Sequence, residues 1–320
     1  VNDMNGMDRR GFLRSSLAAS SGAMGFRFEE RALFERVRMS EAQTAPAPGS
    51  DPLPTGKIKD ITVSRIVCGG NLISGFAHSR DLMYVSPLLE HYFTDEKVME
   101  TLALCEACGV NTAILRLDEH CLRILNVYWR ERGGKIQWIA QVKPKQSDVK
   151  TDIVRAVDNG ATGVYVQGNV SDTFVANQRV DLIGAAVECI KENGVIAGIG
   201  AHEIAVPIAC EKAGLEPDFY MKTLNSKRYW SAGPMPRLDS VWEETPEQTI
   251  EFMRSVAKPW IAFKVLGAGA IHPREGFQYA FENGADFLCV GMFDFQVDED
   301  VQIAKEILAA KPQRAREWKA

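Results

Sequence analysis

The sequence predicts an α/β protein of the (β/α)₈ TIM barrel class, and two observations support this prediction. First, a helical segment that ends in glycine is followed within a few residues by an apolar strand, and this pattern recurs at Gly109, Gly160, Gly194, Gly214 and Gly284. Second, the strands are short apolar runs, which is typical of parallel strands buried on both faces. Strict alternation of such strands with helices predicts a parallel sheet covered by helices. Eight repeats over about 260 residues fit a closed barrel.

The segment 260–293 shows the repeating unit most clearly. Its first part, WIAFKVL, reads as a buried strand. The run GAG at 267–269 interrupts this strand, and Pro273 follows in the first turn of a helix, where its missing N–H costs nothing. The helix ends at Gly284, which supplies a left-handed cap, and the apolar run FLCVGMF follows as the next strand.

In chain order, the same pattern gives eight strands and eight helices. The strands are expected at 61–69, 110–116, 136–143, 163–167, 195–200, 218–223, 260–266 and 286–292. The helices are expected at 94–108, 118–132, 148–159, 179–193, 203–213, 246–257, 273–283 and 297–309. A doubly wound open sheet is the alternative, but it usually carries G-x-G-x-x-G after its first strand. The first strand here ends in CGGNLISG, which lacks that spacing, so the barrel is favoured.

The first 56 residues differ in composition from the barrel region. The stretch DRRGFLRSSLAASSGAMGF combines the pair Arg9 and Arg10 with Phe12, Leu13 and a mildly apolar run of small residues. This order resembles the twin-arginine (Tat) export signal. The chain therefore divides into a Tat-type signal region at 1–45, a Pro/Ala-rich linker at 46–56 and a single barrel domain at 57–320.

The resemblance implies that the folded protein is passed to the Tat translocation machinery and is periplasmic or otherwise exported. The apolar stretch is shorter than the roughly 20 residues that cross a bilayer, so we expect no transmembrane span. A disordered basic arm is the alternative interpretation of this region.

Composition bounds the remaining classes of function. A formal charge of −5 gives no basic face, so we expect no nucleic-acid partner. Seven cysteines, an odd number in 320 residues, do not form the disulfide framework of a small secreted protein. Cys105 and Cys108 have the spacing of a redox pair. The apolar face of their helix would bury Cys105, however, so core packing is favoured.

In a (β/α)₈ barrel the active site lies at the carboxyl ends of the strands. This sequence places many ionisable side chains there, and lysines end three of the strands within apolar flanks. The candidate catalytic residues are Arg116, Asp118, Lys143, His202, Lys222, Asn225 and Lys264. A lysine in a dry pocket near other cations has a lowered pKa, which suits a proton donor, an anion clamp or a Schiff-base nucleophile. Structural ion pairs with Asp118, Glu119 or Glu203 are the alternative.

Histidines at the same end of the strands suggest a metal site as another alternative. His202 and Glu203 would form its centre, with His78, His120 and His272 as further ligands. No H-x-H or H-E-x-x-H spacing occurs in the sequence, so we predict no metal site.

The loops after the first and sixth expected strands are long and aromatic. Long loops at a barrel mouth are usually lids or substrate walls, and their rings would stack on a flat apolar face such as a sugar ring or a nicotinamide. Packing as a satellite core is the alternative. The residues concerned are Phe76, Tyr84, Tyr92, Phe93, Tyr229, Trp230 and Trp242.

Several stretches resemble the aldo-keto reductase superfamily, over about 57–308. They are KIKDITVSRIVCGG, GVNTAIL, WIAQVKPK, GIGAH, KVLGAGAI and CVGMFDFQVDEDVQIAKEIL. The resemblance implies a barrel whose last two loops hold the phosphates of NADP(H). Gly267, Gly269 and Gly291 are the positions that would do so here, together with the start of the helix near Asp298.

The catalytic set of that family, Asp, Tyr, Lys and His, is not retained. Lys143 falls on the expected strand end. Ile114 stands about where the Asp belongs, no Tyr follows the second strand, and Gln167 or Gly168 occupies the place of the His. The resemblance therefore implies the fold but not the mechanism.

Three hypotheses about function follow. The first is an exported oxidoreductase that moves hydride between NADP(H) and a carbonyl or hydroxyl, with a sugar as one candidate substrate; Lys143 would polarise the oxygen and Arg116 or His202 would handle the proton. The second is a cofactor-free lyase, isomerase or aldolase that uses Lys222 or Lys264 as a base or Schiff-base nucleophile. The third is a non-catalytic barrel that binds a small molecule.

Overall fold

The computed structural model describes residues 52–76, 82–228 and 243–320, which lie within one compact unit, Gly49–Ala320. The predicted Tat-type region at 1–45 and most of the linker lie outside the described residues. His78, Tyr229, Trp230 and Trp242 lie outside them as well. No helix in the described part of the chain is long and apolar enough to cross a membrane.

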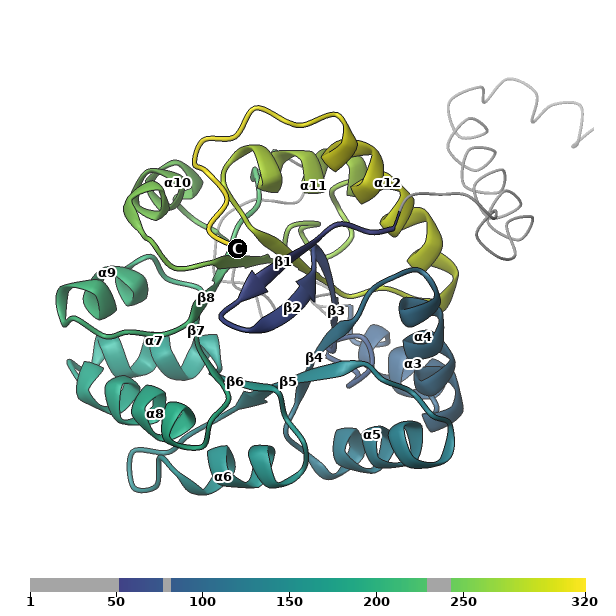
Figure 1. Ribbon diagram of the computed structural model, residues 1–320, viewed down its shortest axis with the longest axis horizontal. Helices are drawn as coiled ribbons and strands as arrows, with labels where there is room; N and C mark the ends of the chain where they lie inside the picture. The colour runs from purple at the N-terminus through teal and green to yellow at the C-terminus, as the bar shows by residue number, and fades with distance from the viewer. Residues whose placement is uncertain (1–51, 77–81, 229–242) are drawn as a thin grey trace, which may run out of the picture. The chain divides into compact units, whose positions relative to one another are not determined.

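Eight parallel strands close into a barrel with helices around it (Figure 1). The closing pair is β10 against β3, with Leu288 opposite Ile66, and β9 pairs with the other edge of β10. The (β/α)₈ TIM barrel prediction is thus confirmed. The barrel strands are β3 (Ile66–Gly69), β4 (Thr112–Arg116), β5 (Gln137–Val142), β6 (Gly163–Val166), β7 (Ile196–Ala201), β8 (Phe219–Thr223), β9 (Trp260–Phe263) and β10 (Phe287–Val290).

Eight of the helices match the predicted ones to within a few residues. They are α4 (Asp95–Ala107), α5 (Glu119–Glu131), α6 (Thr151–Asp158), α8 (Val180–Glu192), α9 (Ala205–Lys212), α10 (Pro246–Ser255), α11 (Pro273–Glu282) and α12 (Val297–Ala309). Within the described residues, three further helical elements were not predicted, namely α3 (Val85–Tyr92), α7 (Gly168–Ala176) and the 3₁₀ turn η2 (Asp294–Gln296). The sequence of α7, GNVSDTFVA, is rich in weak helix formers, so its helix depends on tertiary packing, including burial of Phe174.

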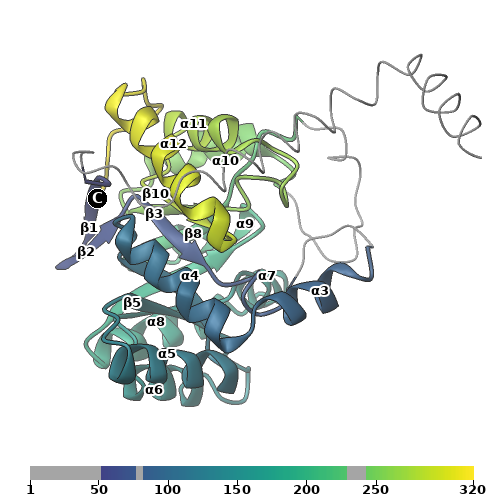
Figure 2. The ribbon, with the colours of Figure 1, turned by 90° about the vertical axis from the view of Figure 1, so that its right-hand side faces the viewer.

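The expected first strand, 61–69, is wrong in one respect because it is two strands. Strand β2 (Ile61–Ser64) pairs antiparallel with β1 (Thr55–Ile58) in a hairpin, and the chain turns at Arg65 before β3 begins. The hairpin buries Ile58 and Val63 in the interior of the barrel and closes its N-terminal end (Figures 1 and 2). Apolar residues stand on both sides of Arg65 and read as one strand, so periodicity alone cannot show that two strands meet there.

Two hydrophobic clusters follow from the alternation of side chains along the strands. The larger one lies between the strands and the surrounding helices and contains Cys105, so core packing of this cysteine is confirmed. All seven cysteines are free. The smaller cluster fills the barrel. Its members are Ile58, Val63, Val67, Ile114, Ile139, Tyr165, Ile196, Phe219, Met221, Ile261, Phe287 and Cys289.

The segment after α12, residues 310–320, returns to the N-terminal end of the barrel, near the hairpin (Figure 2). Its guanidinium groups surround Asp286, which is fully buried: Arg316 Nη2 lies 3.2 Å from Oδ2, and Arg314 Nη2 lies 3.6 Å from Oδ1. The ring of Trp318 is contacted by Arg65 at 4.0 Å and by Arg314 at 3.3 Å. This end of the barrel is therefore held together by a buried charge network.

Candidate functional site

Side chains that face into the barrel continue past the interior cluster to the carboxyl ends of the strands, here termed the mouth. Along β4, Ile114 lies in the interior, and Arg116 shares its face because alternate residues of a strand face the same way. The same alternation along β5, β7 and β8 directs Lys143, His202 and Asn225 inward just beyond the strand ends. By this alternation four of the seven candidate residues face the mouth, and their catalytic role stays a prediction.

His202 is held by Asp172 of α7, a residue that sequence reasoning missed. The Nδ1 atom of His202 lies 2.8 Å from Oδ2 of Asp172. The same carboxylate accepts hydrogen bonds from the backbone N–H groups of His202 and Glu203, each at 3.1 Å from Oδ1. The His202 side chain is 9% exposed. One carboxylate thus fixes both the backbone and the ring, and it leaves Nε2 as the nitrogen that a substrate could meet.

The close approach of α7 to β7 depends on Gly168, the first residue of that helix. A Cβ atom at this position would lie 2.7 Å from Cε1 of His202, so a larger residue would displace the imidazole. On another side, the ring of Phe263 meets the imidazole edge-on, with the centroids 5.3 Å apart. The imidazole is therefore confined by contacts from α7 and β9.

Burial lowers the pKa of His202 below its ordinary value. The hydrogen bond and charge of Asp172 act in the opposite direction, whereas the nearby ammonium groups of Lys264 and Lys222 lower the pKa further. The imidazole is consequently neutral at pH 7. Because the Asp172 carboxylate accepts at Nδ1, the proton belongs on Nδ1 and the lone pair on Nε2, which is the tautomer of a general base.

Lys222 does not belong to the set of side chains at the mouth. Its neighbours at alternate positions, Tyr220 and Leu224, pack in the outer cluster, which places Lys222 on the outer face of β8. There its ammonium group forms a fully buried ion pair with Glu243 and donates to Thr223 Oγ1 at 2.7 Å. The amine is thus enclosed and paired, and burial lowers its pKa, whereas its role as a base or Schiff-base nucleophile stays a prediction.

Arg116 and Lys143 supply positive charge to the mouth from β4 and β5. The guanidinium of Arg116 lies over the ring of Phe76 at 4.2 Å, and its Nε atom is 3.7 Å from Asp118 Oδ2. Partial burial and the charge of Arg116 lower the pKa of Lys143. Two neighbouring cations with one carboxylate at 3.7 Å leave an excess of positive charge, which favours an anionic ligand.

Lys264 and Asn225 lie where β8 and β9 end. Lys264 adopts a φ of 58°, an uncommon conformation for a residue other than glycine, and its charge acts on His202. The buried Asn225 donates from Nδ2 to the carbonyl oxygen of Lys264 at 3.3 Å and accepts from the backbone N–H of Lys227 at 3.2 Å. Asn225 therefore fixes the two loops to each other, a structural role.

One group of possible metal ligands occurs in the described residues, and it does not include His202 or Glu203. Ligand atoms of Asp118, His120 and Cys121 all lie within 4.8 Å of one another. This proximity has a local cause, because Asp118 is the N-cap of α5 and accepts from the backbone N–H of Cys121 at 2.9 Å. Burial raises the pKa of the Cys121 thiol to about 12, which disfavours the thiolate that a metal needs. His272 likewise caps α11, accepting at Nδ1 from the Arg274 N–H.

The junction of β10 and α12 does not fit the phosphates of NADP(H). The first turn of α12 carries Asp298 and Glu299, whose carboxylates already complement the helix dipole and would repel a phosphate. A Cβ atom on Gly291 would lie 3.3 Å from Leu72, so the missing side chain makes room for a leucine. The structure therefore gives Gly291 a packing role.

The turn between β9 and α11 is more open. Gly267, Ala268 and Gly269 have φ values of 53°, 59° and 82°, so three successive residues take the left-handed conformation. A Cβ atom on Gly269 would meet no atom within 4 Å. Of the predicted cofactor positions, only this turn retains space beside the backbone.

The aromatic residues of the first loop separate into two groups. Tyr92 and Phe93 pack with Phe293 of the β10–α12 connection, at centroid distances of 5.4 and 5.3 Å, and this group joins the larger hydrophobic cluster. Phe76 and Tyr84 are exposed. Of these, only Phe76 has a partner at the mouth among the described residues, namely Arg116.

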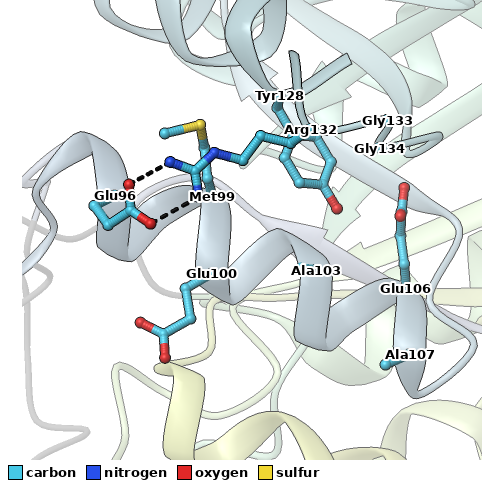
Figure 3. Close-up of a pocket in the computed structure, with 10 residues that line it drawn as sticks. All are labelled: Glu96, Met99, Glu100, Ala103, Glu106, Ala107, Tyr128, Arg132, Gly133 and Gly134. Carbon is cyan, nitrogen blue, oxygen red and sulfur yellow. Dashed lines mark hydrogen bonds and ion pairs between the residues drawn. The ribbon is translucent and has the colours of Figure 1, made fainter. Parts of the chain in front are cut away.

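A groove of about 580 Å³ lies on the outer layer between α4 and α5 (Figure 3). Arg132 and Glu96 cross it in a two-bond ion pair, with Nη1 2.7 Å from Oε1. None of the predicted site residues lines it. The groove is thus separate from His202 and its partners.

Sequence reasoning missed Asp172 and Glu243 because each is remote from its partner. Asp172 lies 30 residues before His202, within a stretch that was expected to be loop. Glu243 lies 21 residues after Lys222. The sequence does offer one signal. Asp172 is the acidic residue of the segment 167–178, which follows β6, and β6 is the neighbour of β7 in the barrel.

No model of a known protein family matches the chain, and no curated protein does. Solved structures do match it. PA4992 from Pseudomonas aeruginosa, titled "the putative aldo-keto reductase", has 16% identity and a TM-score of 0.56, covering 81% of this chain and 97% of its own. Gox0644 in its apo form has 11% identity and a TM-score of 0.51, covering 83% and 96%.

A truncated 3-deoxy-D-arabino-heptulosonate 7-phosphate synthase from Thermotoga maritima is equally similar. It has 13% identity and a TM-score of 0.51, and the match covers 81% of this chain and 94% of that one. A reductase and a synthase thus match to a similar degree. At these identities the likeness establishes the fold alone, a (β/α)₈ TIM barrel.

Proposed function

We propose that this protein is an enzyme that moves protons at a carbonyl- or hydroxyl-bearing carbon of a small anionic molecule, as a cofactor-free lyase, isomerase or aldolase does. The observation that carries this proposal is the His202–Asp172 pair at the mouth, with Nδ1 2.8 Å from the carboxylate. A neutral imidazole oriented by a carboxylate is suited to general acid–base catalysis.

The chemistry assigns one role to each group. His202 Nε2 takes a proton from the carbon next to a carbonyl, and the electron pair moves to the carbonyl oxygen. The cations of Arg116 and Lys143 attract the anionic substrate and stabilise the oxyanion. The imidazolium then returns the proton to a neighbouring atom, so that atoms and charge balance without an added electron carrier.

Proton exchange tests the proposal even where the final product has not been identified. Small 2-oxo acids, hydroxy ketones and their phosphate esters are incubated in D₂O with the protein, and loss of C–H signal is followed by ¹H NMR. The wild-type protein should exchange at least one compound, and His202→Asn should slow this exchange by at least about 100-fold. His272→Asn, which replaces one helix N-cap residue by another, is the matched control.

Two results would contradict the proposal. One is a compound that binds at the mouth yet exchanges no proton in the wild-type protein, which would indicate the non-catalytic binding barrel. The other is full exchange in the His202→Asn variant.

An NADP(H)-dependent oxidoreductase is the second candidate, and the open turn at Gly267–Gly269 is the observation that favours it. Titration of the protein with NADPH, monitored by cofactor fluorescence, tests it, with Gly269→Val as the variant expected to weaken binding. Absence of binding at millimolar cofactor would exclude this candidate. A sugar is one carbonyl substrate to include in that assay.

We also propose export through the Tat machinery, on the basis of Arg9, Arg10, Phe12 and Leu13. Fusion of residues 1–56 to a reporter and fractionation of the cells test it. Replacement of both arginines by lysine should retain the reporter in the cytoplasm, and export of that variant would contradict the proposal.

A further inference from the structure

We propose that the buried pair Lys222–Glu243, acting through Thr223, is a positioning device for the imidazole of His202. This inference rests on the proposed acid–base role of His202, and it assigns to Lys222 and Glu243 a function other than direct contact with substrate. Both side chains are buried, at 0% and 2% exposed. Thr223 connects them to the carbonyl group of His202.

A continuous chain of hydrogen bonds links the pair to His202. Lys222 Nζ is bonded to Glu243 Oε2 and donates to Thr223 Oγ1 at 2.7 Å. The Thr223 hydroxyl lies 3.0 Å from the carbonyl oxygen of His202 and 3.2 Å from Glu243 Oε2. Because the hydroxyl accepts from an ammonium group and has one proton to give, it donates to the shorter contact, the His202 carbonyl.

His202 is consequently held at both of its backbone polar groups. Thr223 binds its carbonyl oxygen, and Asp172 binds its N–H and its Nδ1. A buried carbonyl group that loses its hydrogen-bond donor is destabilised and less restrained. The threonine therefore restrains the backbone from which the imidazole projects.

The pair also balances the charge around the imidazole. The ionisable groups close to His202 are Asp172 on α7, Glu203 after β7, Lys222 on β8 and Lys264 after β9, with Glu243 bonded to Lys222. The ammonium of Lys222 opposes protonation of His202, and the carboxylate of Glu243 offsets this effect. Removing either partner alone should therefore change the proton affinity of His202, and the two changes should have opposite signs.

Titration of the imidazole by NMR measures this effect without any substrate. The His202 signal is assigned in the full-length protein by comparison with the His202→Asn variant. Lys222→Met removes a cation and leaves a carboxylate, so the pKa of His202 should rise by about one unit. Glu243→Gln leaves the cation uncompensated, so the pKa should fall. The double variant should return to near the wild-type value.

Three further variants keep the test informative if Lys222→Met does not fold. Thr223→Val removes the donor to His202 while conserving volume, so it should broaden or displace the His202 resonance, and Thr223→Ser should restore it. Lys258→Met breaks a comparable Lys–Glu pair, Lys258–Glu211 at 2.9 Å, and should leave the His202 titration unchanged.

Opposite shifts for the two single variants, together with rescue by Thr223→Ser, support the positioning role. Shifts of the same sign, or an unchanged His202 titration in folded Glu243→Gln and Thr223→Val variants, overturn it. Because no substrate is involved, these outcomes are independent of the proton-exchange assay, which alone decides the proposed function.

Discussion

The two ends of this barrel use buried charge in opposite ways. At the N-terminal end, Arg314 and Arg316 surround Asp286, Arg65 donates to its carbonyl oxygen, and the hairpin β1–β2 closes the opening. At the mouth, a neutral His202 sits beside Asp172, and Arg116 and Lys143 have one carboxylate near them. At the N-terminal end the buried guanidinium groups contact Asp286 and backbone carbonyl oxygens, which contributes rigidity. At the mouth, the charged groups remain able to bind a ligand or move a proton.

Asp286→Asn should have the largest effect on stability. It leaves the guanidinium groups of Arg65, Arg314 and Arg316 buried without their counter-charge, and burial has already lowered the pKa of Arg65 and Arg314 to about 10. We expect a loss of about 3–5 kcal/mol in the free energy of unfolding, measured by urea denaturation. An effect below about 1 kcal/mol would remove the contrast between the two ends.

Asp300, in the first turn of α12, sharpens the comparison because it is a buried carboxyl with no ion pair among the described residues. Burial raises its pKa to about 7, whereas the unfolded chain ionises it near its ordinary value. The unfolded state therefore binds fewer protons between about pH 4 and pH 7, and stability falls as pH rises through that window. Asp300→Asn should stabilise the protein by on the order of 3 kcal/mol at pH 8 and change little at about pH 4. Equal effects at both pH values would contradict this assignment.

Asp172→Asn tests the mouth in the same terms. The variant loses a charged acceptor for two backbone N–H groups, which should cost about 1–2 kcal/mol, less than the Asp286 variant. The pKa of His202 should fall, because Asp172 is the group that raises it. Denaturation and NMR titration measure the two effects, and a rise in the His202 pKa would contradict the role given to Asp172.

Arg132→Ala should have the smallest effect. Its pair with Glu96 crosses the α4–α5 groove, but the two side chains are 43% and 65% exposed. Exposed pairs contribute about 0–1 kcal/mol and are screened by salt, so the unfolding free energy should change little. A loss of unfolding free energy comparable to that of Asp286→Asn would mean that burial does not determine how much an ion pair contributes to stability.

Local signals were sufficient to predict most of the architecture. Glycine caps and apolar runs give the eight barrel strands and eight of the helices, because in each repeat a glycine marks the end of the helix and an apolar run marks the strand. The hairpin β1–β2 was missed because its apolar residues continue the pattern of β3. Helix α7 was missed because GNVSDTFVA favours helix only weakly, and packing decides its conformation.

The site was predictable to a lesser extent. His202, Arg116 and Lys143 follow from counting to the strand ends, since the carboxyl ends of parallel strands meet. Their partners do not follow, because Asp172 comes from the missed helix and Glu243 from beyond a long loop. Lys222 shows a third limit of prediction from the sequence. The sequence places its strand correctly but does not reveal that its side chain lies on the outer face of β8.

The outward placement of Lys222 has a consequence for redesign of this scaffold. Because consecutive residues of β8 point to opposite sides, moving the amine by a single position, to 221, would carry it into the barrel interior, where Met221 now packs. At 222 it remains buried beside Glu243 and Thr223. An amine that is to form an imine with a substrate in this fold therefore needs a position whose side chain faces the barrel interior.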